Sequence, residues 1–308
     1  MKKILFSLLA VATLIGCGKN DDNGSDSANH LVKKITTKNK DGNLKEVITL
    51  TYQGGRPVSF SEANYENGVQ TGTTVITNIS YEGNFVKRIK VENAGRDNYV
   101  QNFTYKDGKV ATKTEKYERN NYTTTYQYSY AGNQLTNVLK SRPTTIYVNG
   151  NVQSGTYYEE RQFTYRGNTV IEVTTQYEKD LNGAVVTDTS YGTNTITYTL
   201  SGGNVVKEVE ENSYSNSVEE YTYDTKSNPL HYITNFVDPD PTNFLEVDNG
   251  KNNILTYKNT REHNGTKNET LSIFEYTYNA NGYPTVVKQY KEKGNGAREF
   301  RGTKEYEY

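Results

Sequence analysis

The side chains that most often carry catalysis or bind metals are scarce in this chain. It contains three histidines, His30, His231 and His263, and a single cysteine, Cys17. Histidines this far apart do not predict a zinc site, and a lone cysteine excludes an intrachain disulfide. The sequence has no Gly-x-Ser-x-Gly motif and no glycine-rich loop before a helix, which disfavours a serine hydrolase and a phosphate-binding loop. We therefore predict no catalytic residue, no cofactor and no enzymatic activity.

Carboxylates are abundant, and one segment concentrates them. The chain has 36 Asp and Glu residues, but their spacing selects no pair suited to a glycosidase. In the segment 235–253, however, Asp238, Asp240, Glu246 and Asp248 lie close together. Oxygen ligands at this density suit Ca²⁺, although the spacing differs from that of an EF-hand loop. The other interpretation is a solvated loop whose prolines prevent strand pairing. We name these four residues as a possible binding loop, without predicting a metal site.

Tyrosine rings offer a third kind of chemistry. The chain has 28 tyrosines and no tryptophan. Exposed rings of this kind can stack on sugars, as a glycan-binding surface requires, whereas buried rings form a core whose hydroxyls stay near water. Because tryptophan is the commoner sugar platform, its absence favours the core interpretation.

The overall charge is balanced. With 35 basic and 36 acidic side chains the formal net charge is -1. Binding to DNA or RNA depends largely on excess positive charge, so we predict no nucleic-acid partner.

The first residues have the pattern of an export signal. Two lysines follow Met1, and an apolar stretch over residues 4–15 is broken only by Ser7 and Thr13. A basic start before a short hydrophobic region predicts a signal peptide at residues 1–16. A spanning helix needs about 20 residues, so a transmembrane anchor is disfavoured.

The end of this stretch resembles a bacterial lipobox. Leu14, Ile15 and Gly16 precede Cys17, where apolar sequence gives way to polar sequence. In lipoproteins with this motif the cysteine is acylated, for example with palmitate, and the chain is cleaved before it. The resemblance implies that Cys17 carries a lipid anchor in the outer membrane. The alternative is a free thiol beside an ordinary cleavage site.

Residues 17–30 are predicted to be a flexible tether. Beyond the cysteine they are rich in Gly, Ser, Asn and Asp, and such a chain reaches about 20 Å. Lys19, Asp21 and Asp22 resemble the surface-export signal of Bacteroidota lipoproteins. That resemblance implies display on the cell surface, while a periplasmic orientation stays open.

Residues 31–308 repeat one short pattern and are predicted to form a single β-repeat domain. A hydrophobic residue is followed by Ser or Thr, then by tyrosine, then by a turn rich in Gly or Asn. Alternation with a period of two gives a strand one apolar and one polar face. The repeated tyrosines, here called anchors, are Tyr52, Tyr81, Tyr105, Tyr130, Tyr165, Tyr198, Tyr223 and Tyr278.

The turns and the missing helices together predict the fold. Pairs such as Gly54-Gly55 or Asn228-Pro229 follow the anchors and suit tight hairpin turns, so each anchor strand should reverse into a return strand. No segment after residue 30 has a clear helical period, which disfavours a parallel sheet. We predict an all-β antiparallel meander of about 18 strands, forming one large twisted sheet or a soluble barrel. The long gap between Tyr223 and Tyr278 is expected to hold extra strands or a crossing loop.

Two segments resemble known repeat families. Residues 221–224 and 276–282 are similar to the YD-repeat pattern, whose members wrap long sheets. A closer likeness is to Bacteroidota lipoproteins of a tyrosine-rich domain of unknown function, described as porin-like, in which a stretch like Asp224 to Pro229 is followed by one like Asn252 to Ile254. The resemblance implies the fold and the lipid anchor but no activity.

A membrane-spanning barrel is disfavoured because it needs a continuous apolar row facing lipid. Return strands such as Lys207–Glu210 and Lys288–Lys291 have no such row. We therefore expect a non-catalytic binding or scaffolding protein that is attached to the outer membrane by its lipid. Its partner is expected to be a protein or a glycan. The alternative is a glycan-binding component of a nutrient uptake system.

Overall fold

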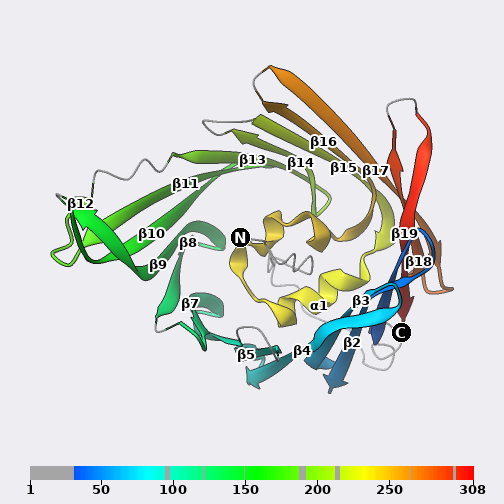
Figure 1. Ribbon diagram of the computed structural model, residues 1–308, viewed down its shortest axis with the longest axis horizontal. Coiled ribbons are helices and arrows are strands. Elements are labelled where there is room, and N and C mark those ends of the chain that lie inside the picture. Colours follow the sequence, from blue (N-terminus) through cyan, green and yellow to red (C-terminus); the bar gives the residue numbers. More distant parts are fainter. Residues whose placement is uncertain are drawn as a thin grey trace.

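The computed structural model describes residues 31–308, apart from 94–97, 121, 149, 187–191, 212–215, 264 and 294–295. The predicted signal peptide, the tether and Cys17 lie outside the described residues. Figure 1 shows the strands arranged as a ring around a short helical segment.

The ring is a closed antiparallel barrel of 18 strands with one extra strand. It closes because β1 (Lys34–Asn39) pairs with both β2 (Leu44–Gln53) and β19 (Arg298–Glu307). The predicted meander is confirmed, and of its two possible forms the structure has the barrel. The remaining strands are β3 (Arg56–Glu66), β4 (Val69–Glu82), β5 (Phe85–Asn93), β6 (Tyr99–Lys106), β7 (Lys109–Tyr117), β8 (Thr123–Ala131), β9 (Gln134–Val148), β10 (Asn151–Arg166), β11 (Thr169–Asp180), the extra strand β12 (Val185–Val186), β13 (Asn194–Ser201), β14 (Asn204–Glu211), β15 (Asn216–Ser227), β16 (Asn252–His263), β17 (Thr266–Tyr278) and β18 (Pro284–Glu292).

The two ends of the barrel differ. The tight turns predicted after the anchors, such as those between β2 and β3 or between β4 and β5, all lie at one end, here called the short-turn end. The chain enters at this end through Val32 and leaves it after β19. The hairpins that join β3 to β4, β9 to β10 and β16 to β17 lie at the opposite end, here called the long-hairpin end.

Most anchor tyrosines join one hairpin to the hairpin before it. Most tight turns are followed by a β-bulge, as between β2 and β3, where Tyr52 pairs with Pro57 but Thr51 pairs with Ser59. Between β10 and β11 the register is instead continuous up to the turn. A bulge disrupts the ladder locally and leaves a backbone group to be satisfied. The tyrosine of the next hairpin donates its hydroxyl to that carbonyl, which explains why the repeat uses tyrosine. The bonds, of 2.6–2.9 Å, are Tyr52 to Val32, Tyr81 to Pro57, Tyr105 to Val86, Tyr130 to Val110, Tyr223 to Val205, Tyr276 to Ile254 and Tyr308 to Pro284.

The anchor assignment needs correction near the end of the chain. In β17 the carbonyl bond is made by Tyr276, while Tyr278 donates to the carboxylate of Asp224. Tyr308 is an additional anchor that the sequence pattern did not identify. Tyr198 donates to Glu172 at 3.4 Å instead of to a carbonyl.

The hydrophobic residues of the repeat point inward. Leu50, Ile79 and Phe103 stand two positions before their anchors and are at most 7% exposed. Farther from the short-turn end, the inward positions become polar or charged and include Gln101, Lys113 and Glu172, all buried. The barrel thus has an apolar core at one end and a polar interior beyond it.

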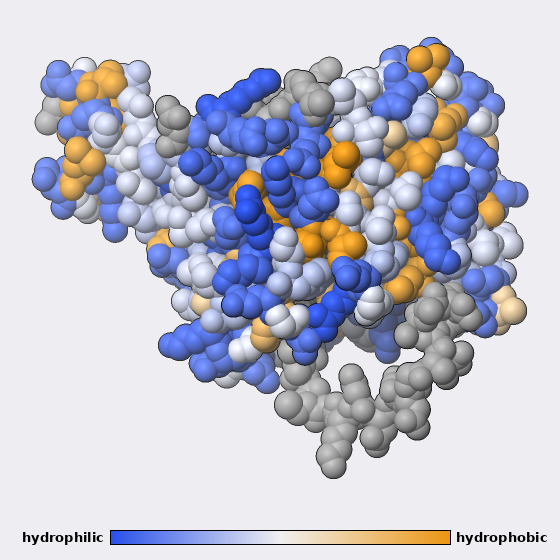
Figure 2. Space-filling view, turned by 90° about the horizontal axis from the view of Figure 1, so that it is seen from below, coloured by the Kyte–Doolittle hydropathy of each residue, from blue (hydrophilic) through white to orange (hydrophobic). Residues whose placement is uncertain are grey.

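The outward face is mainly polar. On β4 and β5 the outward positions include Asn78, Ser80, Arg88 and Lys90. Figure 2 shows one side of the barrel, which is largely hydrophilic, with hydrophobic residues in a broken patch. Among the described residues no helix is long and apolar enough to cross a bilayer.

The gap between Tyr223 and Tyr278 holds a helical segment that lies inside the barrel, here called the plug. It consists of α1 (Pro229–Val237) and the 3₁₀ helices η2 (Pro241–Leu245) and η3 (Val247–Asn249). Figure 1 shows it at the centre of the ring. The interpretation of 235–253 as a solvated loop is therefore wrong for most of the segment, because Asp240, Asn243 and Leu245 are buried, while Glu246 and Asp248 are exposed.

The local sequence explains why the plug is helical. The side chain of Asn228 accepts the Leu230 N–H at 3.0 Å and Pro229 occupies the first helical turn, a common N-terminal arrangement. Asp240 and Pro241 repeat this arrangement at η2. Leu230 and Ile233 face the core beside β1 and β2, so the apolar side of the short helix packs against the barrel wall.

Candidate functional site

A buried ion pair holds the plug to the barrel wall. The Nζ atom of Lys113, on β7, lies 2.5 Å from the Asp240 carboxylate, and both residues are at most 8% exposed. The same carboxylate oxygen accepts the Tyr128 hydroxyl at 2.8 Å, and the other accepts the N–H and hydroxyl of Thr242. Burial alone would raise the pKa of Asp240, but Lys113 and these hydrogen bonds outweigh it and hold that pKa below its usual value. Asp240 is therefore an internal structural anion.

Asp238 is enclosed but less well satisfied. Its Oδ1 atom is buried and has no hydrogen-bond partner among the described residues. Burial raises the pKa of the Asp238 carboxyl, with Lys113 opposing the rise and Asp240 adding to it. A raised pKa means that the neutral form of this carboxyl persists to a higher pH than that of an exposed aspartate.

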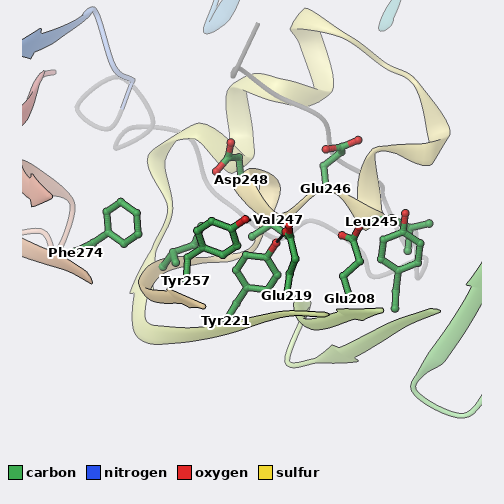
Figure 3. Close-up of a pocket in the computed structure, with 11 residues that line it drawn as sticks. Glu208, Glu219, Tyr221, Leu245, Glu246, Val247, Asp248, Tyr257 and Phe274 are labelled. Atoms are coloured by element: carbon green, nitrogen blue, oxygen red, sulfur yellow. Dashed lines mark hydrogen bonds between the residues drawn. The ribbon is translucent and has the colours of Figure 1, made fainter. Parts of the chain in front are cut away.

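Glu246 and Asp248 face a different space, on the other side of the plug. A cavity of about 350 Å³ separates them from Glu208 on β14 and Glu219 on β15. Figure 3 shows the two glutamates rising from the strands toward Glu246 and Asp248 on the plug, with Tyr221 and Tyr257 beside them. The remaining lining residues are aromatic or aliphatic: Tyr198, Leu245, Val247, Ile254 and Phe274. We call this space the acidic cavity.

The strand register creates the acidic wall. Glu208 and Glu219 are direct cross-strand partners whose side chains point inward. Glu219 is already bonded to Tyr257 at 2.9 Å, to Asn259 at 2.5 Å and to the Tyr221 hydroxyl, so its charge is well solvated by protein. The rings of Tyr221 and Tyr257 are stacked, with centroids 5.2 Å apart. The wall thus combines a fixed carboxylate with aromatic faces.

The other three carboxylates of the acidic cavity have no cation of their own. Within the described part of the chain, Glu208, Glu246 and Asp248 form no ion pair. Partial desolvation inside the barrel raises the pKa of all three, although Glu246 and Asp248 keep surface exposed to solvent. The neighbouring carboxylates add to the rise at Glu208, whose pKa reaches about 7. Lys304 and Arg161 offset this only partly, at Asp248 and Glu246 respectively. The cavity therefore has an uncompensated negative potential.

Comparison with known proteins gives limited information. No protein-family model and no curated protein matches the chain. Two solved structures are similar to it in fold. A porin-like protein from Bacteroides vulgatus aligns with a TM-score of 0.42 and 13% identity over 90% of this chain and 98% of its own. A porin-like protein from Bacteroides uniformis aligns with a TM-score of 0.41 and 15% identity over 90% and 97%. At these values the likeness establishes neither family nor function.

The four acidic residues named from the sequence do not converge on one point. Asp240 is paired with Lys113, Asp238 is enclosed beside it, and only Glu246 and Asp248 reach the acidic cavity. Across the residues that the structure describes, no group of three or more His, Cys, Asp or Glu side chains has the spacing of a metal site. The partners of Glu246 and Asp248 in the cavity, Glu208 and Glu219, were not predicted. Their inward direction depends on strand register, and only Glu208 has a glutamate two positions away, Glu210, as a local signal.

A second hollow opens at the short-turn end, between the plug and the turns from β4 to β14. Its volume is about 570 Å³, and seven of its lining residues are aromatic. Tyr105, Tyr130 and Tyr165 form the barrel side, and Phe236 and Phe244 form the plug side. Phe244 stacks on Tyr165 with centroids 6.2 Å apart. We call this hollow the aromatic groove.

Proposed function

We propose that this chain is a non-catalytic binding protein held at the outer membrane by a lipid on Cys17. In this proposal the acidic cavity binds a cationic group, such as an ammonium or guanidinium, of its ligand. The observation that carries the proposal is the set of three carboxylates that face one cavity without an ion-pair partner.

The composition of the acidic cavity supports an organic cation over a metal ion. Metal ions need several oxygens at about 2.0–2.6 Å from one point, and the described carboxylates do not have that spacing. An organic cation is larger and also gains from aromatic faces such as those of Tyr257 and Phe274. A volume of about 350 Å³ accommodates a group of that size.

The pH dependence of binding tests this role directly. Because the pKa of Glu208 is raised to about 7, this carboxyl is largely neutral at about pH 6 and largely ionised at about pH 8. We expect spermidine and tetramethylammonium, measured by titration calorimetry, to bind more tightly at the higher pH. Glu208→Gln should weaken binding roughly tenfold at about pH 8, since it removes one close charge.

The matched control is Glu220→Gln. Glu220 is on the same part of the barrel as Glu219 but points outward, 3.8 Å from Lys207. It should leave the affinity unchanged. Equal affinity at both pH values, or an equal loss in both variants, would contradict the proposed cation site.

A second candidate is a glycan-binding component of a nutrient uptake system. The stacked pair Tyr221 and Tyr257 beside Glu219 favours it, because protein sites for sugars combine ring stacking with carboxylate hydrogen bonds. A glycan array run with and without Ca²⁺ separates the two candidates. Specific glycan binding that is lost in Tyr257→Ala would favour this one, and a blank array with calorimetric binding of cations would favour the first.

Cys17→Ala tests the lipid anchor. We expect the variant to lose both membrane association and labelling by a clickable palmitate analogue, because no other cysteine is available for acylation. Cell fractionation and in-gel fluorescence measure the two effects. Unchanged labelling would refute acylation of Cys17. Protease digestion of intact cells then distinguishes display on the surface, where the barrel is cleaved, from a periplasmic orientation, where it is protected.

A further inference from the structure

The start of the described chain is fixed at the short-turn end. Val32 is fully buried, and its carbonyl accepts the Tyr52 hydroxyl at 2.7 Å. The next residue, Lys33, donates its N–H to the Glu307 carbonyl at 2.7 Å. Only the 14 residues 18–31 separate Val32 from Cys17. A flexible chain of that length has an average reach of about 20 Å. If Cys17 is anchored in the membrane, the short-turn end is the end held close to it.

The same end presents aromatic surface around the aromatic groove, whereas the exposed hydrophobic residues of the long-hairpin end are mainly aliphatic, such as Val69, Val152 and Leu181. Phe85, at the turn after β4, is 42% exposed, and Tyr232, on α1, is 48% exposed. Both line the aromatic groove. Aromatic side chains of this kind are favoured at the boundary between water and lipid.

The charges of the two barrel ends also differ. We compare the charged residues of each described turn, counted from the last residue of one strand to the first residue of the next. The whole plug segment 229–249, which lies inside the barrel, is left out. At the short-turn end the basic residues are Arg56, Lys106, Lys109, Arg166 and Lys251, and the acidic residues are Glu82 and Asp107. At the long-hairpin end the basic residues are Lys40, Arg119, Lys293 and Arg298, and the acidic residues are Asp41, Glu66, Glu118, Asp180, Glu211 and Glu292. The end that the tether holds near the membrane is therefore the basic one.

From these three observations we propose that the short-turn end docks on the lipid bilayer. Phe85, Tyr232 and the aromatic groove contact the acyl and interfacial region, and the basic turn residues contact anionic headgroups. The attraction between basic residues and an anionic surface complements the apolar contact. This inference rests on the proposed lipid anchor. It places the long hairpins farthest from the membrane.

The absence of tryptophan makes a site-specific test possible. Phe85→Trp and Tyr232→Trp each introduce a single reporter at the short-turn end. Tyr147→Trp, at an exposed position on β9 near the long-hairpin end, is the matched control. Each full-length lipidated variant is incorporated into vesicles of phosphatidylglycerol and phosphatidylcholine, with or without brominated acyl chains. We expect blue-shifted, bromine-quenched emission at positions 85 and 232, and red, unquenched emission at position 147.

The outcomes separate this inference from the anchor on which it rests. Co-flotation with vesicles but no quenching at 85 and 232, or stronger quenching at 147, would refute the docking and leave the anchor intact. Failure to co-float would refute the anchor, and the docking with it. Lys109→Gln combined with Arg166→Gln should reduce quenching at position 85 on anionic vesicles. Lys293→Gln, at the opposite end, should not.

Discussion

Lys113→Met should destabilise the protein by about 3–5 kcal/mol, which is the usual cost of removing one partner from a buried ion pair. The substitution keeps an unbranched side chain, shorter by one atom, and leaves the Asp240 carboxylate buried without its cation. Part of the lost stability comes from weaker attachment of the plug, because this ion pair connects the plug to β7. Denaturant unfolding measures the total effect, and limited proteolysis of segment 229–249 reports release of the plug.

Two comparisons make this prediction specific. Lys34→Met removes an exposed pair with Glu307 and should cost at most about 1 kcal/mol. Adding Asp240→Asn to Lys113→Met should restore part of the lost stability, because the amide carries no charge yet can still accept the Thr242 hydrogen bonds. If the double variant is less stable than Lys113→Met alone, an uncompensated Asp240 charge is not the cause.

Gly302→Ala should open the closing seam of the barrel, at a cost of about 3 kcal/mol or more. Gly302 lies on β19 with a φ of +150°, a backbone conformation that residues with a side chain rarely adopt. An added Cβ would lie 2.1 Å from the Lys38 carbonyl oxygen on β1, so the two strands would have to separate. The exposed edges would then favour association between molecules. Thermal unfolding and light scattering at several concentrations measure the two effects.

Gly265→Ala is the control for Gly302→Ala. Gly265 also has a positive φ, of +74°, but an added Cβ there meets nothing within 4 Å. Its cost should be limited to the backbone conformation, about 1 kcal/mol, without association. Equal effects of the two substitutions would mean that close approach of β1 and β19 is not what Gly302 permits.

The strands were predictable because their signals are local. The alternation before each anchor, with a glycine pair after it, defines a strand and a turn within about ten residues of sequence. The sequence did not decide between a closed barrel and an open sheet. Closure depends on pairing between β1 and β19, which lie at opposite ends of the described chain, and no local pattern encodes that pairing. At this seam Gly302 is suited to the close approach of β1 and β19 because it has no side chain. It lies outside the repeated pattern, so the sequence alone did not single it out.

The helices of the plug were not predicted because the residue pair at their start is compatible with both a hairpin turn and a helix N-terminus. In Asn228-Pro229 the asparagine side chain accepts the N–H two residues ahead, an arrangement that serves both a turn and a helix N-terminus. The weak helical spacing of Leu230, Ile233 and Val237 could have decided between them. The partner of Asp240 could not be found locally, because Lys113 lies 127 residues away in the sequence.

The tyrosine bond between successive hairpins has a consequence for how such a protein can change size. A two-strand unit with a bulge brings one donor, its anchor hydroxyl, and one acceptor, its bulge carbonyl, so a duplicate of such a unit would bring both hydrogen-bonding groups with it. Tyr52 and Tyr308 make the same bond beside the seam, to Val32 and Pro284. A gene encoding this chain can therefore gain or lose whole hairpins and still specify a closed ring of different circumference. Insertion of a single strand would instead reverse the direction of every strand after it and break the antiparallel closure.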